Sequence, residues 1–360
     1  MINSNIRHLV EKNVYISEIL KAGISYKYNK EMINFINSIS TIDSIKSIQD
    51  FEKALKEIPS RIMNSYYTLK HSYAENTMYG YANELLNYAG LKTKDIFYLP
   101  LMEHGIAVDS YVRHDMNRAC IFQGRYLEQY WNENSNGVPC YCVGPYIHYA
   151  RDYYDNKKLL ENKTKNGRTI LVFPPHSTEK EKNEYTLNKF DDYLFNHLAK
   201  NYDTIIACVF WANLHDRYIE SLSSKGVKLV SAGFKLDPLF VRRLRTILSL
   251  ADTVLYPAFT TSVGFAYYLR KNIIFINNNS EYKMGFGDDY SEKIKDLLAK
   301  GVESQNIIFS EHFAENEIPF NKKQEKLINY YWGIDCIKTP EQIKEIVSEN
   351  KKRIIRRFGF

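Results

Sequence analysis

Apolar residues recur at spacings of three and four along the first 90 or so residues, a pattern that predicts amphipathic helices. The expected helices span residues 14–22, 31–39, 48–58 and 75–88. Several tyrosines lie toward the end of this region. We expect most of them to pack in the core, while some could stack on a sugar ring: Tyr66, Tyr67, Tyr73, Tyr79, Tyr81 and Tyr88.

The pattern changes after residue 95 to short apolar runs that lack helical spacing. These runs predict buried strands over residues 96–102, 119–122 and 139–143, with a helix over 124–134 between the last two. A strand, helix and strand in this order form a βαβ unit, whose strands are parallel.

Strands and helices alternate throughout the second half of the chain. This order predicts a doubly wound parallel sheet with a ligand cleft at the carboxyl ends of its strands. The expected strands are 169–173, 204–210, 227–231, 253–256 and 273–276, and the expected helices are 191–200, 215–223, 240–250 and a short one before residue 272.

A polar stretch over residues 152–166 carries four lysines and no apolar rhythm, which favours a linker. The predicted domains are therefore residues 1–155, which include the N-terminal helices, and residues 167–345. Residues 346–360 form a C-terminal helix and tail.

Length and charge narrow the class of protein. At 360 residues the chain is long enough for two domains with full cores. Its net charge of +6 comes from widely spread basic residues, which suits an anionic small ligand or membrane surface better than a nucleic-acid groove. The chain has five cysteines and no CxxC pair, and it shows no signal peptide or membrane-spanning segment. We expect a cytoplasmic protein with reduced thiols.

The first candidate site lies in the stretch from Ala251 to Ile276. Thr260, Thr261 and Ser262 stand where a short helix follows a buried strand, and Gly264 permits close approach of a ligand or a neighbouring backbone. Hydroxyls and N–H groups at such a place can hold a phosphate. The alternative is an ordinary Ser/Thr N-cap.

The second candidate follows the strand predicted at residues 96–102. Glu103, His104 and Gly105 lie just past its end. Histidine is suited to proton transfer near neutral pH, and the adjacent carboxylate could hold its charge or tautomer. The alternative is a turn in which His104 only caps backbone groups.

Further candidates follow other strands of the second half. His176 and Ser177 come after Pro174-Pro175, and Glu281 lies in the loop beyond the last predicted strand. The three arginines of the helix over 240–250 could face a phosphate, but a solvated helix face is the commoner arrangement. The chain shows no DxD-like pair after a strand, so we expect neither a metal nor another cofactor, with Asp288-Asp289 in solvent.

The ordered motifs Glu103-His104-Gly105, Pro175-His176-Ser177 and Thr260-Thr261-Ser262 resemble those of bacterial GT-B glycosyltransferases of capsule and lipopolysaccharide synthesis. The resemblance covers roughly residues 95–345. It implies an α/β, GT-B-like fold, with two Rossmann-type domains facing a cleft and extra N-terminal helices. The first domain would hold the acceptor and the second the nucleotide-sugar donor.

The motif order is also similar to that of bacterial sialyltransferases, which use CMP-sialic acid. That resemblance implies that His104 is the base and that His176 and Thr261-Ser262 hold the donor phosphate. Two residues depart from the pattern: Ser177 replaces a proline, and His104 replaces an acidic residue.

Two other functions stay open. Glycerophosphotransferases of teichoic-acid synthesis use similar His-Gly and His-Pro loops, and a catalytically inert subunit could keep the frame to bind a glycan or nucleotide. The expected partners are a nucleotide-sugar donor and a glycan or lipid-linked acceptor, with no nucleic acid. The basic, apolar-tipped tail over 351–360 could touch the inner membrane, or its helix could pack back onto the first domain.

Overall fold

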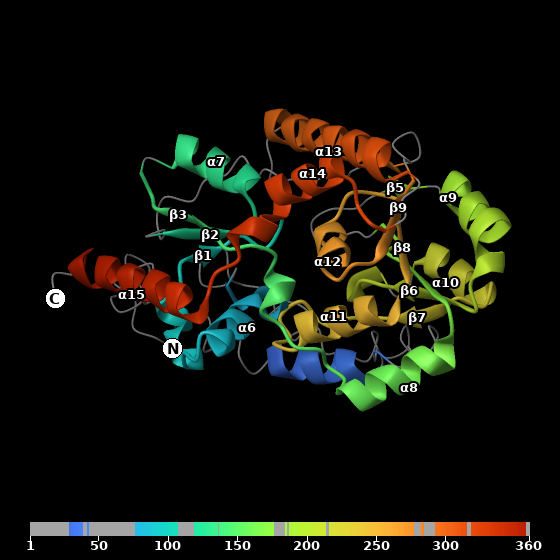
Figure 1. Ribbon diagram of the computed structural model, residues 1–360, viewed down its shortest axis with the longest axis horizontal. Coiled ribbons are helices and arrows are strands. Elements are labelled where there is room, and N and C mark those ends of the chain that lie inside the picture. Colours follow the sequence, from blue (N-terminus) through green and yellow to red (C-terminus); the bar gives the residue numbers. More distant parts are fainter. Residues whose placement is uncertain are drawn as a thin grey trace, which may run out of the picture.

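Two parallel β-sheets organise the chain, with strand orders β1-β2-β3 and β7-β6-β4-β8-β9. Figure 1 shows the smaller sheet on the left and the larger on the right. The computed structural model describes residues 29–38, 42, 76–106, 119–135, 137–175, 184–185, 187–213, 216–276, 282–283, 292–314 and 318–357.

The strands are short and almost entirely buried. They are β1 (Leu101–Met102), β2 (Cys120–Phe122), β3 (Cys140–Cys142), β4 (Thr169–Val172), β6 (Thr204–Cys208), β7 (Lys228–Val230), β8 (Thr253–Tyr256) and β9 (Asn272–Phe275). A separate antiparallel ribbon pairs β5 (Glu184–Tyr185) with β10 (Tyr282–Lys283).

Helices surround both sheets. They are α6 (Tyr81–Tyr88), α7 (Arg125–Asn134), α8 (Asn156–Asn166), α9 (Asn188–Asp192), α10 (Arg217–Ser224), α11 (Phe240–Leu250), α12 (Ser262–Tyr268), α13 (Glu292–Phe313), α14 (Lys322–Trp332) and α15 (Pro340–Arg357), with another helix over residues 29–38. None of the helices in the described ranges is long and apolar enough to cross a membrane.

The larger sheet is covered on both faces, as its continuous apolar strands require. Leu171 packs in the core that contains α11 and α12, while its neighbours Ile170 and Val172 pack in the core that contains Phe190 of α9. The chain runs from the central strand β4 outward to β6 and β7, then returns to β8 and β9 on the other side. This confirms the predicted doubly wound parallel sheet and is compatible with a Rossmann-like fold.

One apolar core joins the two sheets. Ile121 and Val143 of the smaller sheet belong to the same buried cluster as Val254 of β8 and Phe265 of α12. The opposite face of the smaller sheet packs against α7 through Phe122 and Trp131, whose ring centroids are 5.4 Å apart. The sheets therefore share a continuous buried interface.

The arginines of α11 bind groups of the chain itself, so the expectation of a solvated helix face is wrong. Arg242 pairs with the buried Glu84 of α6 at 2.8 Å. Arg243 is itself buried and pairs with Asp237 at 2.8 Å. Arg245 donates to the carbonyl oxygen of Ile147 at 2.8 Å. Glu84 and Ile147 lie far from their arginines in sequence, and Asp237 precedes the helix, so helical periodicity could not identify these partners.

Two predicted elements differ in the structure. The expected strand over 96–102 is a 3₁₀ helix (Thr93–Tyr98) followed by the two-residue β1. The Asp95 carboxylate accepts a hydrogen bond from the Lys92 N–H at 2.9 Å and thereby favours the helical turn. The polar stretch expected as a linker is α8, whose N-cap Asp155 accepts from the Lys158 N–H at 2.7 Å.

The remaining helical predictions are confirmed in part. The helix expected over 31–39 spans residues 29–38, and those at 14–22 and 48–58 lie outside the described residues. The helix expected over 75–88 is interrupted at Tyr79 and Gly80, whose φ angles are 57° and 71°. The segment after Asp192 winds as a π-helix (Tyr193–Leu198) and a 3₁₀ turn (Ala199–Asn201).

The C-terminal helix α15 packs against α6 and the Thr93–Tyr98 helix, on the smaller-sheet side of the molecule. Ile343, Ile346 and Val347 are buried there, and the Asn350 amide donates to the Tyr98 carbonyl oxygen at 2.9 Å. The expectation that this helix packs back onto the first part of the chain is confirmed. Its core contacts come from its first half, because Ile355 is 38% exposed.

We predict that Ile346→Ala destabilises the fold by about 2–4 kcal/mol, because it removes buried methylenes and leaves a cavity under α15. Urea unfolding followed by circular dichroism measures the change. Ile355→Ala, the same substitution on the exposed side of the same helix, is the matched control and should stay within about 0.5 kcal/mol of wild type. Equal losses in both variants would contradict the described packing.

Candidate functional site

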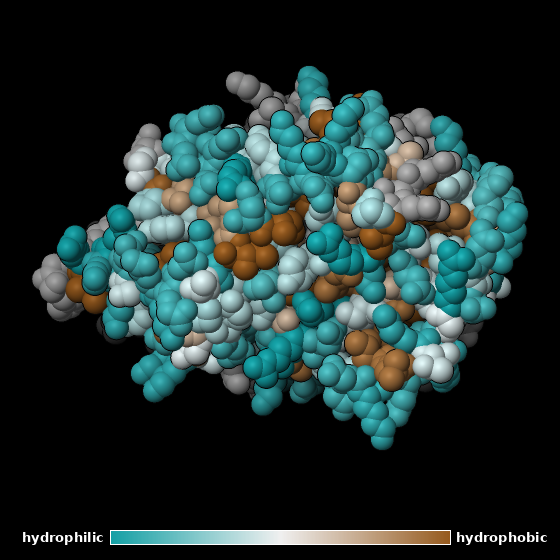
Figure 2. Space-filling view, viewed as in Figure 1, coloured by the Kyte–Doolittle hydropathy of each residue, from teal (hydrophilic) through white to brown (hydrophobic). Residues whose placement is uncertain are grey.

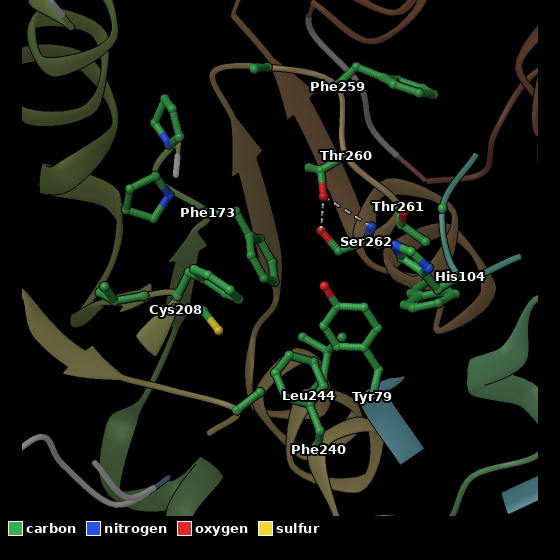
Figure 3. Close-up of a pocket in the computed structure, with 18 of the residues that line it drawn as sticks. Tyr79, His104, Phe173, Cys208, Phe240, Leu244, Phe259, Thr260, Thr261 and Ser262 are labelled. Atoms are coloured by element: carbon green, nitrogen blue, oxygen red, sulfur yellow. Dashed lines mark hydrogen bonds between the residues drawn. The ribbon is translucent and has the colours of Figure 1, made fainter. Parts of the chain in front are cut away.

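A cavity of about 370 Å³ lies where the carboxyl ends of strands from both sheets converge (Figure 3). The larger sheet contributes residues that follow β4, β6, β7 and β8, and the smaller sheet contributes His104 and Gly105 after β1. The lining from the larger sheet includes Phe173, Pro174, Pro175, Cys208, Val209, Phe210, Ala232, Ala258, Phe259, Thr260, Thr261 and Ser262.

The cavity sits at the topological switch point of the larger sheet. The chain leaves β4 toward β6 on one side, whereas β8 lies on its other side. The loops after β4 and β8 therefore separate toward opposite faces of the sheet and open a crevice at their ends, which is where open α/β sheets bind ligands.

The loop after β8 presents hydroxyl groups to this cavity. The Thr260 hydroxyl lies 3.3 Å from the Ser262 hydroxyl and accepts from the Ser262 N–H at 3.4 Å. Thr261 is the N-cap of α12, but its side chain makes no capping hydrogen bond. The ordinary Thr261 cap is therefore not formed, and the hydroxyl of Thr260 serves the start of the helix instead.

The same loop is held from behind by two C-terminal helices. The Phe259 N–H donates to the Asn306 side-chain oxygen of α13 at 2.6 Å. The Trp332 indole N–H of α14 donates to the Thr261 carbonyl oxygen at 3.0 Å. Tyr256 holds the backbone of Ser262, because the Tyr256 hydroxyl donates to the Ser262 carbonyl oxygen at 2.8 Å. These bonds fix the backbone that carries the three hydroxyl side chains.

Gly264 does not line the cavity. A Cβ atom on Gly264 would lie 2.1 Å from the Trp332 ring, so the close neighbour that this glycine admits is a side chain of α14. Its lack of a Cβ is explained by packing, and we withdraw it from the candidate ligand contacts.

His104 and Gly105 reach the cavity from the smaller sheet, and His104 is half-buried beside Tyr79, with ring centroids 5.5 Å apart. Glu103 is not part of the described lining. Its N–H donates to the Ile121 carbonyl oxygen at 3.1 Å, and its own carbonyl oxygen accepts from the Tyr146 hydroxyl at 2.9 Å. The backbone of Glu103 thus anchors the turn that presents His104.

Three other predicted site residues, His176, Ser177 and Glu281, lie outside the described residues. Pro174 and Pro175, which directly precede His176, are buried and line the cavity. The structure therefore brings His104 and Gly105 of the first motif and all of the third motif to one cavity, together with Pro175, the first residue of the second.

Sequence patterns alone did not identify the aromatic part of this lining. Tyr79, Phe173, Phe240 and Phe259 are half-buried residues of the wall. Phe173 ends one predicted strand and Phe259 follows another, so their positions carried a usable signal. Tyr79 was among the tyrosines expected to pack or to stack on a sugar ring, but no pattern placed it at this cavity, because it reaches the lining through a helix break. Phe240 was expected only as the start of a helix, and it lines the cavity from the start of α11.

The described lining is largely uncharged. It contains His104 but no Asp, Glu, Lys or Arg. Burial raises the pKa of the Cys208 thiol to about 12, so this sulfur stays a neutral thiol near pH 7. Across the described ranges, no group of three or more His, Cys, Asp or Glu side chains lies together to hold a metal ion.

Comparison with protein-family models and with curated proteins finds no family and no relative that matches this chain.

We predict that Gly264→Ala destabilises the protein by about 1–3 kcal/mol, because the added methyl overlaps the Trp332 ring. Gly301→Ala on α13 is the matched control, since nothing lies within 4 Å of its added Cβ. That substitution should be neutral or stabilise the protein by up to about 1 kcal/mol. Urea unfolding compares the two, and a Gly264→Ala variant as stable as wild type would refute the packing role.

Proposed function

We propose that this protein is a glycosyltransferase that moves a sugar from a nucleotide-sugar donor to a bacterial surface glycan acceptor without a metal ion. The supporting observation is that His104 from the smaller sheet and the Thr260–Ser262 hydroxyls from the larger sheet line one cavity. In this proposal the two sheets belong to the two Rossmann-type domains of a GT-B-like enzyme, which bind acceptor and donor, respectively.

The proposed chemistry needs a base on one side of the cavity and hydrogen-bond donors on the other. An acceptor hydroxyl would attack the anomeric carbon of the donor sugar, and the bond from that carbon to the phosphate oxygen would break. The imidazole of His104 would take the proton of the acceptor. The hydroxyls of Thr260, Thr261 and Ser262 would donate hydrogen bonds to the departing phosphate.

The aromatic wall is consistent with a nucleotide ligand. Phe173 stacks on Tyr256 with ring centroids 5.4 Å apart and an angle of 5° between the rings, so its orientation is fixed. Fixed aromatic rings hold flat bases and sugar rings with little loss of side-chain entropy. A cavity of about 370 Å³ is at the small end of the range for ligand sites.

We predict that at least one of UDP, GDP, CMP, CDP and dTDP raises the thermal unfolding midpoint. A ligand at 100 times its Kd stabilises the native state by about 2.7 kcal/mol, which corresponds to a shift of a few degrees. Differential scanning fluorimetry measures it, with the matching nucleosides as controls. No shift with any nucleotide would contradict the proposal.

His104→Asn should lower turnover by roughly 10²–10⁴-fold and leave donor affinity nearly unchanged, because a general base acts in the transition state. Donor hydrolysis or transfer by the purified protein provides the assay. His197→Asn is the matched control, because this exposed histidine lies outside the cavity lining. A His104→Asn variant with normal turnover would assign His104 a structural role. Nucleotide binding without any hydrolysis or transfer would favour an inert binding subunit.

Replacing Thr261 and Ser262 together by Ala should weaken nucleotide binding, since each lost hydrogen bond to a phosphate costs on the order of 1.5–3 kcal/mol. Calorimetric titration measures the affinity. The control replaces Ser304 and Ser310 by Ala. Their hydroxyls form exposed hydrogen bonds to carbonyl oxygens of their own helix, α13. Unchanged affinity in a folded Thr261/Ser262 variant would exclude this loop as the phosphate site.

A further inference from the structure

Tyr79 adopts a backbone conformation that bulky residues rarely take. Its φ is 57° and its ψ is 7°, in the left-handed region, where a Cβ-bearing residue is strained. The next residue, Gly80, also has a positive φ of 71°. Strained positions of this kind persist only where the surroundings hold them, and they concentrate at ligand and active sites.

Contacts from the larger sheet hold the strained turn in place. The Tyr79 N–H donates to the Lys235 carbonyl oxygen at 2.6 Å. A Cβ atom on Gly80 would lie 2.2 Å from the Pro238 carbonyl oxygen, so the two backbones are in direct contact. The turn is therefore fixed to the loop between β7 and α11 of the larger sheet. The helix that follows the turn, α6, packs in the core beside the smaller sheet.

This anchoring directs the Tyr79 side chain into the cavity. The ring packs on Phe240 at a centroid distance of 4.9 Å and on His104 at 5.5 Å. Figure 3 shows the ring between α11 and the loop after β8, with its hydroxyl pointing toward Thr260 and Ser262. Tyr79 thus contacts the predicted base and points its hydroxyl toward the predicted phosphate site.

The other described tyrosines of this region have different surroundings. Tyr81 also borders the cavity but is only 6% exposed, and burial raises the pKa of its hydroxyl. Tyr88 packs on His148 and Tyr149, outside the cavity lining. Tyr79 is half-buried, lines the cavity and points its hydroxyl to the Thr260–Ser262 loop.

We propose that Tyr79 is a substrate-binding residue whose hydroxyl donates a hydrogen bond to the donor phosphate beside Thr260 and Ser262. The inference rests on the proposed function and adds a phosphate contact supplied by the N-terminal part of the chain. The described lining contains no lysine or arginine, and His104 is assigned to the acceptor, so hydroxyl groups are the main side-chain donors left there for a phosphate. The ring contact with Phe240 sets the direction of this hydroxyl.

Tyr79→Phe tests the proposal because it removes only the hydroxyl and keeps the ring between His104 and Phe240. Binding of two probes is compared by calorimetric titration: the nucleotide that stabilises the wild-type protein most, and its nucleoside, which lacks phosphate. We expect at least a roughly tenfold loss of nucleotide affinity, about 1.4 kcal/mol, with nucleoside affinity unchanged within twofold. Tyr88→Phe, the control, should bind both probes as wild type does.

The possible outcomes separate the two proposals. Equal nucleotide affinity in wild type and Tyr79→Phe would overturn the role of Tyr79 and leave the proposed function standing. An equal loss for nucleotide and nucleoside would overturn the phosphate contact and assign Tyr79 to the base or ribose. If no nucleotide binds to the wild-type protein, the proposed function fails, and the role of Tyr79 fails with it.

Discussion

The arrangement of the two sheets depends on two ion pairs, in each of which an arginine of α11 binds a buried carboxylate outside that helix. Glu84 is 3% exposed and Asp237 is 2% exposed, and they pair with Arg242 and Arg243, respectively. A buried carboxylate without its cation is strongly destabilising, so each pair constrains the elements that carry it. The Arg242 pair joins α11 of the larger sheet to α6, and α6 packs in the core beside the smaller sheet. The helix α11 contributes Phe240 and Leu244 to the cavity lining, and the Arg242 pair ties this helix to α6 beside the smaller sheet.

The C-terminal third of the chain supports the same cavity from the other side. Asn306 and Trp332 bond to the backbone of the loop after β8, and Trp332 fills the space that Gly264 leaves open. α14 also packs against α7 beside the smaller sheet. A site held on several sides in this way can keep its hydrogen-bond donors oriented before a ligand arrives. Such preorganisation is what electrostatic stabilisation of a departing phosphate requires.

Much of the larger sheet was predictable because its signal is local. A buried parallel strand is a continuous apolar run, and the helix over 240–250 has the bounds of α11. His104 and the Thr260–Ser262 loop were each expected at a site because they directly follow a strand, and the resemblance to two-domain glycosyltransferases implied that they face one cleft. Their chemical roles remain predictions.

The sequence did not predict contacts between residues that lie far apart along the chain. No pattern near Gly264 shows that Trp332 packs against it, and none near Asp237 indicates Asn37, whose amide donates to the Asp237 carboxylate at 2.9 Å. Tyr79 belongs to the same group, because Lys235 and Pro238 fix its strained turn. The helix α8 was missed because its N-cap, Asp155, was counted as part of a polar linker.

The central claim is that one cavity between the sheets binds a nucleotide with groups from both of them. A crystal structure of the protein with the nucleotide that stabilises it most tests this directly. We predict the phosphate within hydrogen-bond distance of the Thr260 or Ser262 hydroxyl, with His104 also facing the ligand. A nucleotide bound elsewhere, with this cavity empty, would contradict it.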